Sequence, residues 1–197
     1  DIIVSNTLND RITVFYNKGD RRFSIMTNFA TGWQPRAMAA FQKHDNEPPH
    51  LVVANLGDRT ISFLENFKDG LFTPPMTVPF QERPLDIATI DYAEDGIMDI
   101  AILAETSSAV YFTTLDSLKK SQTEHKIELS ISPTRFAFVD LNDDALAEMI
   151  VLSSRKRVLH IYENQGGTFA SAPATYALGK QPRDFVAVDL DGDTDLD

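Results

Sequence analysis

The chain has 197 residues, 43% of them apolar, and a formal net charge of −11. The apolar fraction is large enough for a globular core, and an acidic balance without a basic run argues against a nucleic-acid partner held mainly by its phosphates. The absence of Cys excludes disulfides and thiolate zinc sites, and apolar runs of about five residues are far shorter than the ~20 that a membrane-spanning helix needs.

The sequence repeats with a period of 49 residues, and a fixed period indicates a repeat architecture. The recurring prolines are Pro35, Pro84, Pro133 and Pro182, and the residues before the apolar runs are Asp1, His50, Asp99, Glu148 and Asp197. We expect a single domain, 1–197, with the repeats 1–49, 50–98, 99–147 and 148–196. Because Asp1 already lies within the pattern, with neither an initiator Met nor a signal peptide before it, we expect a piece of a longer chain.

The pattern opens with two predicted strands. The first is short and β-branched, and the second, after a polar turn, has the alternating apolar residues of a half-buried strand. The first strands are 2–6, 51–55, 100–104 and 149–153, and the second strands are 12–17, 61–66, 109–114 and 158–164. Three second strands end in Asn and lead through a Gly-containing turn to a Phe, which predicts a hairpin. These pairs are Asn17 and Phe23, Asn66 and Phe72, and Asn164 and Phe169.

A weaker strand follows, and then a strand that begins after the repeated Pro. The strands after Pro are 36–41, 85–90, 134–139 and 183–188. Small side chains align in them at Ala39, Ala88, Ala137 and Val186. Small residues at one register suit the innermost strand of a blade, where neighbouring sheets converge on a central axis.

Four strands in every ~50 residues, joined by tight turns and without a helical stretch, predict an all-β fold. We expect a β-propeller of four-stranded antiparallel blades. A solenoid or a sandwich is the alternative, but β-helix coils are much shorter and a sandwich has no reason to repeat at this period. Residues 183–189 could complete the blade that residues 1–34 begin, which gives four closed blades; otherwise the protein continues as a larger propeller.

A nine-residue window follows each strand after Pro, and the windows are 42–50, 91–99, 140–148 and 189–197. The last three hold 13 of the 29 acidic residues. Side-chain oxygens at window positions 1, 3, 5 and 9, with a main-chain carbonyl at position 7, suit Ca²⁺, which takes about six to eight oxygen ligands. We therefore predict two calcium sites and a third, degenerate one.

The predicted ligands differ between windows. The last window supplies Asp189, Asp191, Asp193 and Asp197, with the carbonyl of Asp195, and the third supplies Asp140, Asn142, Asp144 and Glu148, with the carbonyl of Leu146. The second window keeps Asp91, Asp95 and Asp99 but has Ala93 at position 3, so it lacks one ligand. The first has Gln42, His44, Asn46 and His50 at these positions, and we predict no calcium there.

An EF-hand is excluded because its twelfth loop position should be Glu. Counting from Asp140 gives Val151 and counting from Asp91 gives Ile102, and strands flank these loops where an EF-hand has helices.

The stretches VDLDGDTDLD (188–197) and VDLNDDALAEMIVL (139–152) resemble the FG-GAP/VCBS repeat, the calcium-binding blade repeat of integrin α-subunit propellers and of many secreted or surface proteins. The resemblance extends over the whole chain and implies calcium at the windows named above. Because propellers of this family usually have six to eight blades, it favours a fragment over a closed four-bladed ring. Ala93 and the window 42–50 depart from the family pattern.

The loops at the other end of the predicted strands form a different face. They contain ten Arg and Lys against seven Asp and Glu. We therefore expect an acidic, calcium-binding face and an opposite Arg-rich face that meets a protein or glycan partner. The candidate ligand residues on the Arg-rich face are Arg59, Arg83, Arg155, Arg157, Arg183 and Trp33. Trp33, the only Trp, is expected to pack between blades rather than to form a sugar platform.

The sequence has no G-x-S-x-G, H-E-x-x-H, P-loop or G-x-G-x-x-G motif, and its four His lie at unrelated positions of the repeat. We therefore expect a non-catalytic, calcium-stabilised scaffold for ligand binding or cell adhesion. The alternatives are the propeller portion of a secreted hydrolase or lyase and a carbohydrate-binding lectin. Exposed sites of this kind need calcium at about 10⁻⁴ to 10⁻³ M, so we expect an extracellular or cell-surface location.

Overall fold

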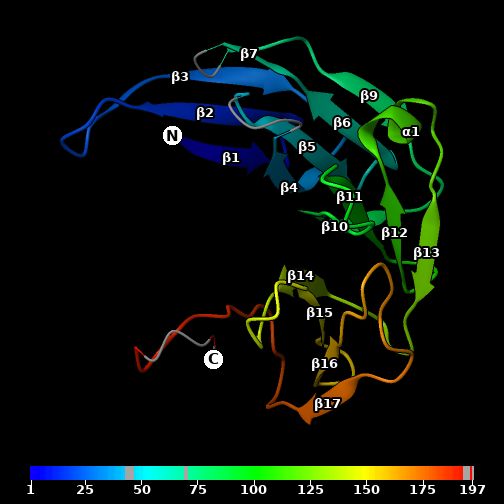
Figure 1. Cartoon of the computed structure of the whole chain (residues 1–197). Coiled ribbons are helices and arrows are strands. Elements are labelled where there is room, and N and C mark those ends of the chain that lie inside the picture. The colour runs from blue at the N-terminus through cyan, green and yellow to red at the C-terminus, as the bar shows by residue number, and fades with distance from the viewer. Residues whose placement is uncertain (43–46, 69–70, 193–195, 197) are drawn as a thin grey trace.

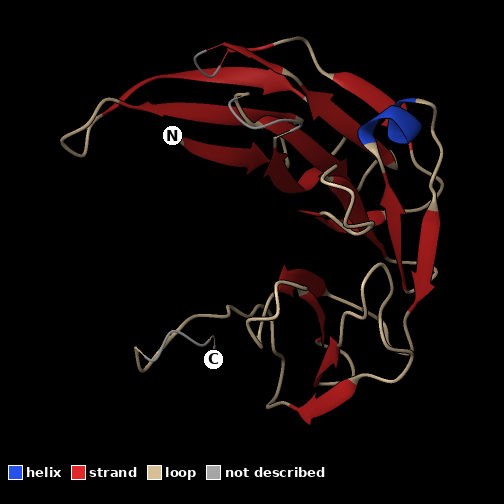
Figure 2. Cartoon of the chain, in the orientation of Figure 1, coloured by secondary structure: helices blue, strands red, loops and turns tan. Residues whose placement is uncertain are grey.

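The computed structural model describes residues 1–42, 47–68, 71–192 and 196. Four antiparallel sheets of three or four strands follow one another along an arc, as Figure 1 shows, and Figure 2 shows that almost all regular structure is strand. This confirms the predicted all-β architecture. Among the described residues, no helix has the length and apolar character that crossing a bilayer requires.

Each sheet runs in chain order from the inner side of the arc outward. The first sheet contains β1 (Ile2–Asn6), β2 (Arg11–Asn17) and β3 (Phe23–Ala30). The second contains β4 (Pro35–Phe41), β5 (His50–Asn55), β6 (Thr60–Leu64) and β9 (Met76–Pro79). The third contains β10 (Pro84–Ile90), β11 (Asp99–Ala104), β12 (Ala109–Thr113) and β13 (His125–Glu128). The fourth contains β14 (Arg135–Val139), β15 (Glu148–Ser153), β16 (Val158–Tyr162) and β17 (Ala174–Ala177).

The core lies between neighbouring sheets. Strands β5, β11 and β15 are buried at every position. One apolar cluster joins the second and third sheets and includes Phe41, Phe63 and Leu115. Another joins the third and fourth sheets, where Phe169 stacks on Tyr92 and Phe112 with ring centroids 5.9 and 6.2 Å apart.

The repeat extends to backbone conformation. The turn before the strands β2, β6, β12 and β16 has one residue with positive φ in each sheet, at Asp10, Arg59, Ser108 and Arg157, each 49 residues after the one before. The predicted hairpins are confirmed. They close through the short strands β7 (Asn66–Lys68) and β8 (Leu71–Phe72), through a bridge between Asn164 and Phe169, and through a bond from Lys18 N to Arg22 O.

The prediction that the chain has no helical stretch is wrong. The third sheet has no Asn–Gly–Phe hairpin, and α1 (Leu115–Lys119) occupies that place. The side chain of Thr114 accepts a hydrogen bond from the Ser117 N–H, Asp116 lies in the first turn, and Leu115 and Leu118 are buried. These are ordinary helix-start signals, and they override the alternating pattern at the end of β12.

The predicted strand at 183–188 does not form, and among the described residues no ladder joins this segment to β1. The other strands that follow a Pro pair with a strand beginning at His50, Asp99 or Glu148. The segment 183–188 has the alternation of a strand but no such hydrogen-bonded neighbour among the described residues. The described residues do not close a four-bladed ring.

Candidate functional site

The third acidic window folds around its own carboxylates. Asp140 follows β14, and its Oδ1 accepts from the N–H groups of Asn142 and Asp144, both at 3.3 Å, while its Oδ2 accepts from Ala145 N at 2.8 Å. Asp144 Oδ1 accepts from Leu146 N at 2.8 Å. The loop can turn back on itself because Asp143 and Ala145 have positive φ. The carboxylates of Asp140 and Asp144 thus lie within one tight turn.

The second window has the same backbone framework. Asp91 accepts from Asp95 N at 3.1 Å and from Gly96 N at 2.9 Å, and Asp95 accepts from Ile97 N at 2.9 Å. These bonds connect the same window positions as those of the third window. The difference is at position 3, where Ala93 provides no side-chain oxygen. The degenerate window therefore keeps the turn but lacks one oxygen ligand for a metal ion.

The last acidic residue of each window lies at the base of the loop. Asp99 Oδ2 accepts from Tyr92 N at 3.1 Å, and Glu148 Oε2 accepts from Leu141 N at 2.9 Å. Both residues are buried, with 5% and 4% of their surface exposed. Burial raises the pKa of Asp99, against the backbone hydrogen bonds that lower it. The other oxygen of Glu148, Oε1, is buried and has no hydrogen-bond partner among the described residues.

Within the described part of the chain, no three His, Asp or Glu side chains are grouped as a metal-binding cluster. The oxygens of Asp140 and Oδ1 of Asp144 face backbone N–H groups, and Asp144 Oδ2 accepts from the Asn142 side-chain amide at 3.0 Å. A carboxylate has about four acceptor positions, so these bonds leave further lone pairs on both residues.

The remaining windows are described in part. In the last window, Asp189 Oδ1 accepts from Gly192 N at 2.6 Å, and Asp191 is exposed. The predicted ligands Asp193, Asp195 and Asp197 lie outside the described residues, as do His44 and Asn46 of the first window. There, His50 is buried and its Nδ1 accepts from Asn66 N at 3.1 Å, so a hydrogen-bond acceptor for the β6–β7 backbone replaces the acidic residue.

The Arg-rich face lies at the opposite ends of the strands, because the antiparallel order places the turn after β5, β11 or β15 away from the acidic windows. Arg59, Arg155, Arg157 and Arg183 are exposed there, and Arg83 pairs with Glu105 at 2.7 Å. Trp33 is 64% exposed, so the expectation that it packs between blades is wrong. Its backbone N–H donates to Asp58 and its carbonyl accepts from Gly57, which hold the loop while the indole faces outward.

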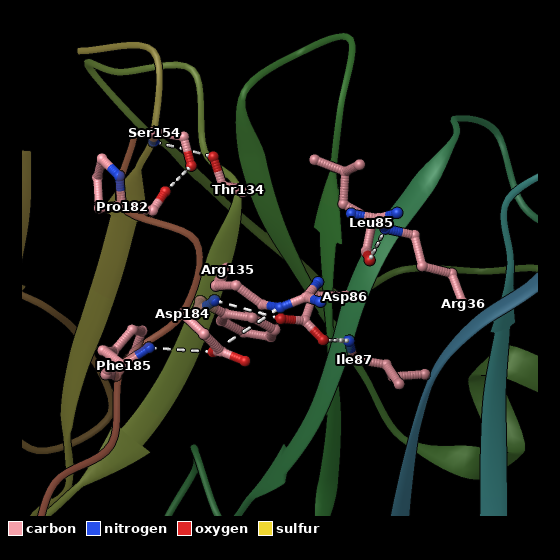
Figure 3. Close-up of polar contacts among 11 residues, drawn as sticks. Arg36, Leu85, Asp86, Ile87, Thr134, Arg135, Ser154, Pro182, Asp184 and Phe185 are labelled. Carbon is pink, nitrogen blue, oxygen red and sulfur yellow. Dashed lines mark hydrogen bonds and ion pairs between the residues drawn. The ribbon is translucent and has the colours of Figure 1, made fainter. Parts of the chain in front are cut away.

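A charged cluster that sequence reasoning missed lies at the start of the innermost strands (Figure 3). Asp86 accepts from Ile87 N at 3.1 Å and from Phe136 N at 3.4 Å, and Arg135 Nε lies 3.9 Å from Asp184 Oδ1. Burial raises the pKa of Asp86, against the charges of Arg135 and Arg36. Asp86, Arg135 and Asp184 are each 49 residues apart, so alternating charge at one repeat position was the available signal.

A polar contact also ties the fourth sheet to the segment that follows it. The Ser154 N–H donates to Thr134 Oγ1 at 3.0 Å, and the Ser154 hydroxyl donates to the Pro182 carbonyl, as Figure 3 shows. Thr7 makes the equivalent bond to Pro35 O at 3.0 Å in the first sheet. These bonds hold Pro35 and Pro182 against the preceding sheet.

Comparison with known proteins supports the last repeat and the fold. Residues 140–197 match the model of the FG-GAP-like repeat. No curated protein matches the sequence. Among solved structures, two crystal structures of BBS1N in complex with ARL6DN match over 91% of this chain: the mercury-soaked one with TM-score 0.61 and 13% identity, the lead-soaked one with 0.60 and 16%.

A protein of unknown function from Bacteroides caccae matches over 96% of this chain and 61% of its own, with TM-score 0.52 and 13% identity. The chain covers 49% and 53% of the two BBS1N chains, so it spans about half their length. At these identities the likeness concerns the fold. The chain is therefore a run of antiparallel propeller blades, of which the first has three described strands and the next three have four, and residues 140–197 are similar to the FG-GAP-like repeat.

Proposed function

We propose that this chain is a non-catalytic, calcium-stabilised propeller scaffold that binds a protein partner outside the cell. The observation that carries the calcium part is the buried Oε1 of Glu148, which has no hydrogen-bond partner among the described residues. An unpaired buried carboxylate oxygen is costly, so a bound cation explains why an acidic residue stands there. The residues of the window provide the rest of an oxygen donor set.

In the third window, Asp140, Asn142, Asp144 and Glu148 would hold the ion with the Leu146 carbonyl. A bound Ca²⁺ would neutralise the carboxylates and fix the hairpin between β14 and β15. The chain's own contribution is the preformed turn, in which backbone N–H groups already orient Asp140 and Asp144. The last window would hold a second ion through Asp189 and Asp191 with its other acids, and the second window a weaker one.

The partner part of the proposal rests on charge and on the fold. Arg59, Arg155 and Arg157 lie exposed in turns at one end of the blades, away from the acidic windows. Two solved structures with this fold are of BBS1N in complex with ARL6DN, which favours a protein over a glycan as the partner. The extracellular location follows from the calcium concentration of about 10⁻⁴ to 10⁻³ M that exposed oxygen sites need.

The calcium part is tested by calorimetric titration of Ca²⁺ and Mg²⁺ into the wild-type protein and two charge-matched variants, Asp144→Asn and Asp143→Asn. Asp144 is at a ligand position, whereas Asp143 is its neighbour and has a positive φ that Asn tolerates. We expect Asp144→Asn to weaken calcium binding about tenfold, because it removes one ligand charge, and Asp143→Asn to change it little. The absence of calcium binding to the wild-type protein, or equal loss in both variants, would contradict the assignment.

The partner part is tested separately. A protein captured by the wild-type chain should bind the double variant Arg155→Ser/Arg157→Ser several-fold more weakly, with unchanged thermal stability. The double variant Arg21→Ser/Arg22→Ser, in an exposed hairpin between β2 and β3, is the control. Equal binding of the captured protein to both variants would remove the Arg-rich face from the proposal.

A further inference from the structure

A groove opens between the second and third sheets, at the ends of the strands that carry the acidic windows. It encloses ≈ 410 Å³, and its walls include Phe41, Ile97, Met98, Thr114, Leu115 and Asp116. Phe41 and Leu115 belong to the apolar cluster between the two sheets, and Met98 packs against that cluster. The groove is therefore the open end of the inter-sheet core.

The second sheet has a groove at the same repeat positions, and its walls mix polar and apolar residues. They include Glu47, Pro48, His50, Glu65, Asn66 and Phe67. Pro48 and Asn66 are the repeat equivalents of Ile97 and Leu115. Of these two grooves, only the one next to the third sheet has mainly apolar walls. Two departures from the repeat account for this difference.

Leu115 is the first departure from the repeat. In the second sheet, the Asn66 amide donates to Pro49 O at 3.2 Å, and in the fourth, the Asn164 amide donates to Ala147 O at 3.1 Å. Leu115 stands at the equivalent position and has no amide to donate. A side chain that elsewhere closes the base of the acidic window is replaced by an apolar wall.

The second departure is the loss of the hairpin Phe. In the fourth sheet, Phe169 stacks on Phe112. The repeat equivalent of Phe112 is Phe63, and there the Nζ of Lys119 from α1 lies 5.5 Å from the ring centroid instead. Helix α1 therefore replaces the aromatic cover of this inter-sheet core, and Ile97 at the edge of the groove remains 54% exposed.

The rim of the groove is acidic. In the window 91–99, Asp95 is exposed and accepts a hydrogen bond from Ile97 N of the groove wall, whereas Asp99 is buried. On the other side, Asp116 has 85% of its side chain exposed, and among the described residues Lys119 Nζ lies 4.0 Å from it. An apolar wall with a negative rim favours an apolar side chain next to positive charge.

We propose that this groove docks a protein partner through one apolar side chain flanked by basic residues. This surface is separate from the Arg-rich face and does not depend on calcium in the third window. The apolar side chain contacts Ile97, Met98 and Leu115, and the flanking bases meet the exposed Asp95 and Asp116.

The test uses a pentapeptide with Phe at its centre and two Lys on each side, titrated into the isotopically labelled protein and followed by backbone amide shifts and calorimetry. We expect the shifts to centre on residues 96–98 and 114–116. The same peptide with Ser in place of Phe should bind about tenfold more weakly, because the central contact is apolar. A peptide with Glu in place of Lys should not bind.

Three protein variants test whether the peptide binds in the groove or merely to an acidic surface. A melting curve for each variant confirms that it is folded. Ile97→Ser should weaken the Phe peptide about tenfold, and Asp116→Asn about twofold. Phe67→Ser is the control, because Phe67 is the repeat equivalent of Asp116, is 78% exposed and lines the groove of the second sheet instead. Its affinity should be unchanged. Shifts elsewhere, equal binding of the Phe and Ser peptides, or unchanged affinity in Ile97→Ser would overturn the proposal.

Discussion

Arg36 and Leu85 occupy the same position of successive repeats, and the Nε of Arg36 donates a hydrogen bond of 3.1 Å to the carbonyl oxygen of Leu85. Thr89 donates in the same way to Ala40 O, 49 residues earlier, at 3.3 Å. The innermost strands of neighbouring blades share no ladder, so side-chain bonds between equivalent positions connect them. The repeat period is therefore visible in contacts as well as in sequence.

The Arg135 side chain is expected to stabilise the boundary between the third and fourth blades. Replacement by Met removes the positive charge beside Asp86 and Asp184 and leaves the half-buried Asp86 less compensated, which should cost about 1–3 kcal/mol of unfolding free energy. The measurement is urea unfolding at neutral pH.

A double-mutant cycle of Arg135 and Asp86 separates the effect of charge on stability from the effect of packing. In the Arg135→Met background, Asp86→Asn should restore part of the lost stability, because Asn keeps an acceptor for the Phe136 N–H and carries no charge. Strictly additive losses in the double variant would show that Asp86 and Arg135 do not interact energetically.

Phe169 is expected to be a main stabilising contact between the third and fourth blades. It is 8% exposed and stacks on Tyr92 and Phe112, so Phe169→Ala should cost about 3–5 kcal/mol of unfolding free energy. Phe67→Ala is the matched control, since Phe67 is 78% exposed, and its cost should stay within about 0.5 kcal/mol. Similar losses from both substitutions in chemical unfolding would contradict the inter-blade role.

The strands inside the sheets could be predicted from sequence because their pattern is local. The runs that became β5, β11 and β15 are short, β-branched and repeated at one period, so each copy supports the others. The helix α1 was missed because one repeat departs from the rest, although Thr114, Asp116 and the pair Leu115 and Leu118 carry a helix-start signal.

The contacts between blades could not be predicted in the same way. The period shows that Asp86, Arg135 and Asp184 occupy equivalent positions of successive repeats. Only the structure shows that these three side chains lie close together in space. Exposure is also set by tertiary packing, as Trp33 shows: its sequence context suited an inter-blade contact, and the observed loop turns the indole outward.

His160 is expected to make the protein less stable in mild acid. Burial lowers its pKa below the ordinary 6.5, so between its folded pKa and 6.5 the unfolded chain binds more protons than the folded chain. Stability should therefore fall as pH drops below 6.5 through the folded pKa. His160→Gln cannot gain the proton, so the wild-type advantage over this variant should shrink from pH 7.5 to about 5.5 in urea unfolding.

The exposed His125 provides the control for this pH effect. His125→Gln should leave the pH dependence close to that of the wild-type protein. A constant difference between wild type and His160→Gln across the same pH range would show that the buried imidazole does not contribute to acid sensitivity.

The second acidic window should gain calcium affinity when its missing oxygen is restored. The hydrogen bonds that Asp91 and Asp95 accept from backbone N–H groups match those of the third window, so the turn is already formed. The side chain of Ala93 is exposed, so there is room for a larger residue. Ala93→Asp should therefore add a calorimetric binding event or tighten the weakest one. Because a ligand that binds only the folded state stabilises it by RT ln(1 + [L]/Kd), the melting temperature in calcium should also rise.

Two variants test whether the gain comes from the ligand position or from charge alone. Ala93→Ser adds a weaker oxygen without charge and should have a smaller effect than Ala93→Asp. Moving the new acid outside the ligand set, as in Gly96→Asp, would strain a residue with φ of +79°, so Ile97→Asp is the better charge control. Equal calcium enhancement by Ala93→Asp and Ile97→Asp would mean that added charge, rather than a completed oxygen set at position 3, attracts the ion.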